Sequence, residues 1–440
     1  MMHTRAAIAA ASIAVGLAPR PALANGRFPA ANQLVIDPGD ATHLVLRTTY
    51  GLLQTTDSGT SWSWICEQAV GYGGTEDPAI GITGDGTVLA GFFEGLSVSH
   101  DRGCSWGIIA GPLDQQYAID VTVETNVPAR ALVLTSLGMK DLFRTALTET
   151  VDDGATWTQV GVPMSTDLLG LTVEIAPSRL ERVYVSGLAG ASFGGVIARS
   201  DDRGETWTQF SLEGASAPYI GAVDPTNPDR LYVRVDSRDT ADDELYLSDD
   251  GAATWTKIFT STQDMLGFAL SPDGSKVAAG GPEAGLFVAS TRDFVFSQVS
   301  QLRVKCLKWH QDGLYACADE FVDGFTLGLS KNDGATFDAL YHLPDLSPLE
   351  CGAETPTGNV CPATWPDIAT TIGADSSSGS GSRTRGASSS LMSGTSAQRR
   401  DDAPSCEVRG HAPGQPSGES RAAVFSALAA LVLLVPLRRR

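Results

Sequence analysis

Carboxylate side chains are the groups in this 440-residue sequence whose number and clustering could do chemistry. Two carboxylates across a cleft can hydrolyse a glycosidic bond, because one donates a proton while the other attacks the sugar or activates water. Several carboxylates on one surface can instead attract Ca²⁺ or a basic peptide. The candidate ligand-face residues, which fall in predicted loops, are Glu94, Asp236, Asp239, Asp242, Asp243, Glu244, Asp319, Glu320 and Asp323.

These carboxylates do not define a site by themselves. Acidic side chains in the loops of an acidic protein are usually solvated, which is the simpler interpretation. The stretch 239–244 lacks the Asp-x-Asp-x-Asp-Gly spacing of a calcium loop. We therefore predict no cofactor, with Ca²⁺ as the one ion that the acidic loops could hold.

Two further patterns fail as catalytic or metal sites. The stretch Gly190–Gly194 matches the Gly-x-Ser-x-Gly pattern of a nucleophilic serine. It falls between two predicted strands, however, whereas that motif needs a strand that turns into a helix. The six histidines include no pair at metal-ligand spacing. The sequence therefore predicts no catalytic residue and no metal site.

The net charge of −20 limits the class of partner. Arginines are concentrated near the C-terminus, so the part of the chain before them is more acidic still. A surface of this sign repels a phosphate backbone, which argues against nucleic acid. The expected partner is an unidentified protein, peptide or glycan on the acidic loops.

A repeated phrase, Ser/Thr-x-Asp-x-Gly-x-Thr-Trp, indicates the elements that position these loops. Repetition about every 40–50 residues is typical of a circular or stacked array. Five good copies lie at 55–62, 99–106, 150–157, 200–207 and 248–255, and two worn copies lie at 290–296 and 330–337. The key positions are Asp57, Trp62, Asp101, Trp106, Asp152, Trp157, Asp202, Trp207, Asp250, Trp255, Asn332 and Phe337.

Each copy has the composition of a turn between two strands. Its Asp can accept hydrogen bonds from its own turn, its Gly supplies a positive φ, and its Trp can pack between neighbouring sheets. Short strands and turns fill the intervals, as at 33–36, 43–47, 51–55 and 62–65. We therefore predict an all-β fold, a seven-bladed β-propeller of four-stranded antiparallel blades over residues 25–343. The carboxylate loops would then crowd the face opposite the repeated turns.

The repeated phrase resembles the Asp-box of β-propellers such as sialidases, xyloglucanase-type glycosidases, the sortilin ectodomain and plant photosystem assembly factors. The resemblance implies that the boxes are structural and lie on the outer rim, away from any ligand. It also implies a binding or scaffolding module.

The enzymes of this group carry residues that are missing here. Sialidases have an Arg-Ile-Pro signature, which Arg27-Phe28-Pro29 does not match, and Thr49 stands where xyloglucanase-type enzymes have a catalytic Asp. We therefore favour a non-catalytic binding module. A glycoside hydrolase of either type and a surface structural protein without a discrete ligand are the alternatives.

The ends of the chain predict export and anchoring. Residues 1–24 are expected to form a signal peptide, with an apolar stretch after Arg5 and cleavage after Ala24. Residues 374–421 are expected to form a flexible stalk that contains Cys406, followed by an apolar helix and arginine cluster at 422–440. This tail resembles the MYXO-CTERM sorting tail of myxobacterial surface proteins, which implies attachment to the cell surface at Cys406. A plain C-terminal membrane anchor is the alternative.

The other six cysteines predict disulfides, as expected for an exported protein. An extension at 344–373 carries two of them and is expected to pack across the seam of the ring. Sequence proximity favours the pairs Cys66–Cys104, Cys306–Cys317 and Cys351–Cys361.

Overall fold

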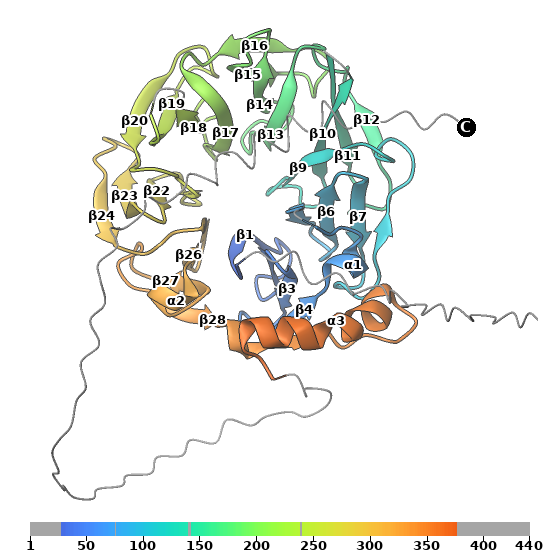
Figure 1. Ribbon diagram of the computed structural model, residues 1–440. Helices are drawn as coiled ribbons and strands as arrows, with labels where there is room; N and C mark the ends of the chain where they lie inside the picture. The colour runs from blue at the N-terminus through green and yellow to red at the C-terminus, as the bar shows by residue number, and fades with distance from the viewer. Residues whose placement is uncertain (1–27, 75, 140–141, 238–239, 376–440) are drawn as a thin grey trace, which may run out of the picture.

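The computed structural model describes residues 28–74, 76–139, 142–237 and 240–375. Ala24, Asp239, Cys406 and the C-terminal apolar run lie outside these residues. Seven blades, each built of four antiparallel strands, surround a central axis (Figure 1), and a fifth strand is added in parallel to the sheet of the first blade. The predicted all-β, seven-bladed propeller is therefore confirmed.

The strands of each blade follow one another from the axis outward. Blade 1 contains β1 (Ala31–Ile36), β2 (Leu44–Thr48), β3 (Gly51–Thr55) and β4 (Trp62–Ile65). Blade 2 contains β5 (Ala79–Ile82), β6 (Val88–Phe92), β7 (Gly95–Ser99) and β8 (Gly107–Ile108). Blade 3 contains β9 (Ala118–Val123), β10 (Ala131–Met139), β11 (Leu142–Thr150) and β12 (Thr158–Val160). Blade 4 contains β13 (Leu169–Ile175), β14 (Val183–Ala189), β15 (Gly194–Ser200) and β16 (Thr208–Ser211).

The remaining blades and helices complete the ring. Blade 5 contains β17 (Ala215–Val223), β18 (Leu231–Ser237), β19 (Asp243–Ser248) and β20 (Thr256–Thr260). Blade 6 contains β21 (Gly267–Leu270), β22 (Lys276–Gly281), β23 (Gly285–Ser290) and β24 (Ser297–Ser300). Blade 7 contains β25 (Cys306–His310), β26 (Gly313–Cys317), β27 (Leu327–Ser330) and β28 (Asp338–Tyr341). Outside the blades lie α1 (Glu67–Val70), α2 (Glu320–Asp323), the 3₁₀ turn η1 (Leu343–Asp345), β29 (Leu346–Pro348) and α3 (Pro356–Ile372).

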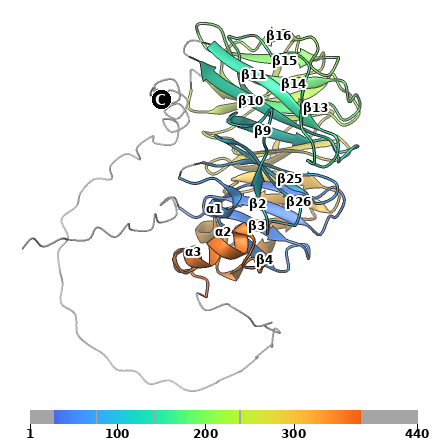
Figure 2. The ribbon, with the colours of Figure 1, turned by 90° about the vertical axis from the view of Figure 1, so that its right-hand side faces the viewer.

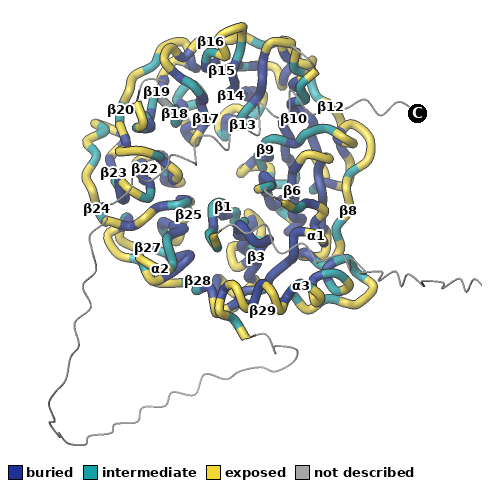
Figure 3. The backbone as a smooth tube through the Cα atoms, in the orientation of Figure 1, coloured by how far each residue is buried: buried dark blue, intermediate teal, exposed yellow. Residues whose placement is uncertain are grey.

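Buried residues are concentrated in the strands of the blades (Figure 3), and apolar side chains of neighbouring blades share single clusters. Every residue of β5, β6 and β7 is buried. Trp157, which ends the repeated turn of blade 3, packs in one cluster with Leu89 and Val98 of blade 2 and Val133 of its own blade. Burying a large apolar side chain contributes roughly 1.5–3 kcal/mol, so these clusters hold adjacent blades together.

The repeated turns share one hydrogen-bonding pattern. In blade 4, Asp202 accepts a hydrogen bond from the backbone N–H of Thr206 at 2.8 Å and one from its hydroxyl at 2.7 Å. These bonds lower the pKa of Asp202. Arg203 and Gly204 both have positive φ, of 59° and 89°. The turn thus satisfies its own polar groups, which suits a structural element.

The segment after blade 7 closes the ring from outside. β29 pairs in parallel with the outermost strand of blade 1, placing Leu346 opposite Trp62 and Pro348 opposite Trp64. α3 runs along the outer side of blade 1 (Figure 1), where the rings of Trp365 and Trp64 have centroids 5.5 Å apart.

No helix among the described residues is long and apolar enough to cross a membrane.

Two of the three expected disulfide pairings are wrong. The bonds are Cys66–Cys361, Cys104–Cys351 and Cys306–Cys317, so only the last expected pair is confirmed. The extension lies against blade 1 and the repeated turn of blade 2, where the Thr357 hydroxyl donates to the Gly103 carbonyl at 2.6 Å. Each cysteine of the extension therefore meets a blade cysteine, while α3 carries Cys361 away from Cys351. Three disulfides agree with an oxidising, extracellular environment.

Candidate functional site

The two faces of the propeller carry different connections. Hairpins between second and third strands, and the connections between blades, lie on one face, because strands alternate in direction and every blade starts at the axis. We call this the loop face. The repeated turns lie on the opposite face, which we call the turn face. Helices α1 and α2 belong to the loop face and lie along one side of the disc in Figure 2.

The predicted carboxylates of blade 5 are held within the blade. Asp243 is buried, and its Oδ2 accepts a hydrogen bond from the Met265 backbone N–H at 2.8 Å. Burial raises the pKa of Asp243 to about 6. Glu244 pairs with Lys257 at 2.9 Å. These two groups stabilise the blade and do not project as a ligand cluster.

The remaining predicted carboxylates lie at two separate hairpins, with Asp236 and Asp242 at the β18–β19 hairpin of blade 5 and Glu94 in blade 2. Asp242 accepts a hydrogen bond from the backbone N–H of Gln263 at 2.9 Å. Asp236 lies 3.7 Å from the Arg234 guanidinium. Glu94 is exposed at the β6–β7 hairpin of blade 2. The structure therefore does not bring these three together.

The three predicted carboxylates of blade 7 surround α2. Asp319 lies 3.2 Å from Lys305, and Glu320 lies 3.1 Å from His342. Asp323 accepts a hydrogen bond from the Asp319 backbone N–H at 3.0 Å. Among the described residues, no group of three or more His, Cys, Asp or Glu side chains is placed to hold a metal ion.

Sequence reasoning missed two carboxylates on the innermost strands. Asp120 of β9 and Glu174 of β13 are half-buried beside the axis. Burial raises the pKa of Asp120 to about 6, and burial together with the charge of Asp120 raises the pKa of Glu174 to about 8. Carboxyl groups whose pKa is raised in this way are candidates for proton transfer. A single carboxylate in a short strand gives no sequence signal.

Asp120 also has a structural role. Its Oδ2 accepts a hydrogen bond from the Val173 backbone N–H of the next blade at 2.9 Å, and its Oδ1 accepts one from Val121 at 3.0 Å. The Thr172 hydroxyl likewise accepts from the Ile220 backbone N–H at 3.0 Å. Side chains of one innermost strand thus satisfy unpaired backbone groups on the edge of the next.

Exposed aromatic side chains are the second feature that sequence reasoning missed. Phe28, Phe93, Phe193 and Phe321 are 60%, 39%, 46% and 65% exposed, and they are the exposed phenylalanines of the described chain. All four lie on the loop face. Phe28 precedes β1, Phe93 and Phe193 stand at hairpin tips, and Phe321 lies on α2. No sequence pattern distinguishes these phenylalanines from the buried ones.

These phenylalanines form three ring pairs around the loop face. Phe28 pairs with Phe321 at 5.1 Å, Phe93 with Tyr117 at 4.4 Å, and Phe193 with Phe143 at 6.2 Å between centroids. Each pair joins segments from two adjacent blades. Phe193 has a φ of 49°, a left-handed conformation that glycine or asparagine adopts more readily. The Gly190–Gly194 stretch is the β14–β15 hairpin, and the strand-to-helix turn of a serine nucleophile is absent there.

Comparison with known proteins finds distant structural neighbours. No protein-family model and no curated protein sequence matches the chain. Solved structures similar to it include a GH74 enzyme from Niastella koreensis, with 15% identity over 71% of this chain and a TM-score of 0.46. The GH74 xyloglucanase of Xanthomonas campestris has 16% identity over 70% of this chain and a TM-score of 0.36. The chain spans less than two thirds of these enzymes, 53% and 64% of their lengths.

A propeller of another kind is similar to the same extent. The β-propeller domain of Cps50 (Swd1) from Myceliophthora thermophila has 11% identity over 66% of this chain and 93% of its own length, with a TM-score of 0.42. These TM-scores are all below 0.5 and the identities are 16% or lower, so the likenesses assign no activity to the chain.

Proposed function

We propose that the protein is an exported, cell-surface-anchored β-propeller that acts as a non-catalytic binding or scaffolding module through its loop face. The observation that carries this proposal is that the four exposed phenylalanines of the described chain all lie on that face. Large apolar side chains gathered on one surface are typical of an interaction site. The turn face instead exposes aliphatic side chains at Val127, Val151 and Val295.

The anchoring part of the proposal rests on the sequence. Cys406, the stalk and the arginine-ended apolar run have the architecture of a MYXO-CTERM sorting tail, and the disulfides agree with export. Replacing Cys406→Ala should release the protein from the surface of intact cells or send it elsewhere. Unchanged surface retention of this variant would favour a plain membrane anchor.

Glycoside hydrolysis is the second candidate, and the carboxyl groups of Asp120 and Glu174 beside the axis are the observation that favours it. A carboxyl group with a pKa near 8, as for Glu174, is protonated at neutral pH and could donate a proton. The second carboxylate would be Asp120. Both of its oxygens, however, already accept hydrogen bonds from backbone N–H groups. Turnover of any glycoside in a chromogenic screen, lost in Glu174→Gln, would support the hydrolase and overturn the non-catalytic proposal.

The binding proposal is tested with one pair of matched variants. The loop-face variant is Phe93→Ser/Phe193→Ser/Phe321→Ser, and the turn-face control is Val127→Ser/Val151→Ser/Val295→Ser. Full-length protein is applied to glycan and peptide arrays, with circular dichroism as a check of folding. Truncating an interface anchor typically costs about 2 kcal/mol or more of binding free energy. Affinity should therefore fall at least about tenfold in the loop-face variant alone. Equal loss in both variants would contradict the proposal, and no binding on either array would favour a purely structural role.

A further inference from the structure

We infer that the loop face binds a polypeptide that carries basic and apolar side chains, and that Phe321 and Val322 on α2 are its anchor. This inference rests on the proposed function and names the partner class. Phe321 is 65% exposed and Val322 is 56% exposed, side by side on a single helical turn. Together they form an exposed apolar projection on the loop face.

Hydrogen bonds hold this projection rigidly. Asp319 accepts from the Phe321 backbone N–H at 3.1 Å, and Gly324 closes the turn in the left-handed conformation. Asp323 accepts from the Arg303 backbone N–H at 3.2 Å. An exposed apolar group that is already fixed loses little conformational entropy on binding, which is the property of an interface anchor.

The base of α2 is fixed as well. Glu320 accepts from the Thr326 hydroxyl at 2.7 Å. The Cys306–Cys317 disulfide joins the two strands β25 and β26 directly before α2. Phe28 packs against Phe321 from the side, with ring centroids 5.1 Å apart. The projection is therefore supported from blade 7 and from the segment that enters blade 1.

Ring orientation favours a polypeptide over a sugar. The planes of Phe28 and Phe321 are tilted by 58°, those of Phe93 and Tyr117 by 53°, and those of Phe143 and Phe193 by 74°. None of these pairs forms a continuous flat platform on which a sugar ring could stack. Tilted rings and an exposed Phe-Val turn fit between the apolar side chains of another polypeptide.

Charge indicates a basic partner. The chain has a net charge of −20, and residues 28–375 are more acidic still, because arginines exceed carboxylates both before and after them. Next to α2, Lys305 is engaged by Asp319 and lies 5.9 Å from the centre of the Phe28 ring. Complementary charge would steer a basic segment to this face, while the apolar anchor would determine how long it stays.

The test uses full-length protein and an array of synthetic peptides in which Lys or Arg is interspersed with Leu, Ile or Phe. A matched array carries Glu in place of each basic residue, and salt is kept at about 0.15 M to screen distant charges. The variant Phe321→Ser/Val322→Ser is compared with the turn-face control Val295→Ser, whose side chain is equally exposed at 66%. We expect basic peptides to bind, and we expect affinity to fall at least about tenfold in the α2 variant only.

Three outcomes would overturn the inference. These are equal binding of the acidic array, unchanged binding in Phe321→Ser/Val322→Ser, and absence of binding to any basic peptide. If glycans bind and the triple loop-face variant loses them, the binding function stands while the polypeptide partner is wrong. If basic peptides bind but no loop-face variant affects them, the proposed binding face fails as well.

Discussion

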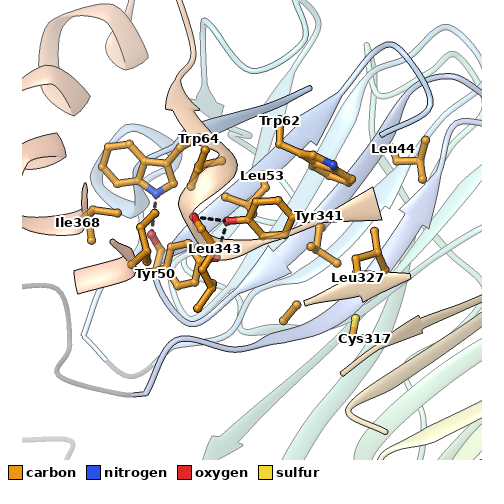
Figure 4. Close-up of a cluster of buried hydrophobic side chains, with 14 of the residues drawn as sticks. Leu44, Tyr50, Leu53, Trp62, Trp64, Cys317, Leu327, Tyr341, Leu343 and Ile368 are labelled. Atoms are coloured by element: carbon orange, nitrogen blue, oxygen red, sulfur yellow. Dashed lines mark hydrogen bonds between the residues drawn. The ribbon is translucent and has the colours of Figure 1, made fainter. Parts of the chain in front are cut away.

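The hydroxyl groups of Tyr50 and Tyr341 lie 3.0 Å apart in the buried seam between the first and last blades, 291 residues apart in sequence (Figure 4). Trp62 and Trp64 surround this pair, and Trp64 Nε1 donates to the Tyr50 carbonyl at 2.7 Å. Burial raises the pKa of both phenols well above the usual value near 10. The seam is thus closed by neutral, hydrogen-bonded phenols.

The first prediction concerns pH. Because the folded-state pKa values of these phenols are raised, their stabilisation is fully present below about pH 10 and is lost as the pH rises above it. The variant Tyr50→Phe/Tyr341→Phe should lose about 1–2 kcal/mol at neutral pH and should show weaker alkaline destabilisation. Urea unfolding at neutral and alkaline pH measures both effects. An alkaline destabilisation equal to that of the wild type would contradict the assignment.

The second prediction concerns the two disulfides that hold the extension. Cys66–Cys361 and Cys104–Cys351 span 295 and 247 residues, but each shortens the loop that the other closes. Each doubling of loop length adds about 0.6 kcal/mol to the entropic cost of closing the loop. Either bond alone leaves only a short loop for the other to close, so losing both bonds should lower the free energy of unfolding by about 1–2 kcal/mol more than the sum of the two single losses. Chemical unfolding of Cys361→Ser with Cys66→Ser, of Cys351→Ser with Cys104→Ser, and of the fourfold variant measures this coupling. Strict additivity would contradict it.

The third prediction concerns a buried ion pair within blade 3. Glu149 is 5% exposed and pairs with Arg130 at 2.6 Å and with Arg203 at 2.5 Å. Arg130 is 7% exposed, whereas Arg203 is 50% exposed. Arg130→Ala should destabilise the protein by about 3 kcal/mol, because it leaves a carboxylate partly unpaired in the core. Arg203→Ala is the matched control and should lower the free energy of unfolding by less than about 1 kcal/mol. Equal destabilisation by the two variants would show that burial of the arginine does not decide the effect.

The fourth prediction concerns Glu174. Its raised folded-state pKa means that its stabilisation is present below about pH 4.3 and is lost as the pH rises toward 8. Glu174→Gln retains an acceptor for the Thr122 hydroxyl, which lies 3.2 Å away, and it does not titrate. Its Tm relative to wild type should therefore be about 2 °C or more higher at pH 8 than at pH 4. Glu94→Gln, an exposed control, should show no such trend, and a flat difference for Glu174→Gln would refute the assignment.

The fifth prediction concerns the repeated turns. In the worn turn of blade 7, Asn332 accepts from the Thr336 backbone N–H at 3.0 Å and donates to its hydroxyl at 2.9 Å. An amide can therefore replace the acid. Asp57→Asn should lower the Tm less than Asp57→Ala, because Asp57 accepts from the Ser61 backbone N–H and hydroxyl at 2.9 and 2.7 Å. Thermal melting of both variants decides this, and equal losses would mean that the carboxylate charge itself is needed.

The sequence was sufficient for the architecture but not for the surface. Local turn chemistry repeats with the blades, so the number of blades and strands could be read from the copies of the phrase. The pairing of Cys66 with Cys361 could not be predicted in this way, because it depends on where the extension at 344–373 lies in space. The same limit applies to Glu174, whose pKa depends on an adjacent blade, and to Phe321, whose exposure depends on α2.

Closure by β29 and α3 sets an order of events during synthesis and export. The Cys306–Cys317 bond joins two neighbouring strands and can form as soon as the hairpin of blade 7 does. The other two bonds need the extension, which emerges after all seven blades. A segment that follows all seven blades therefore locks the first blade, and the exported chain has a finished ring only once residues 344–373 have crossed to the oxidising side.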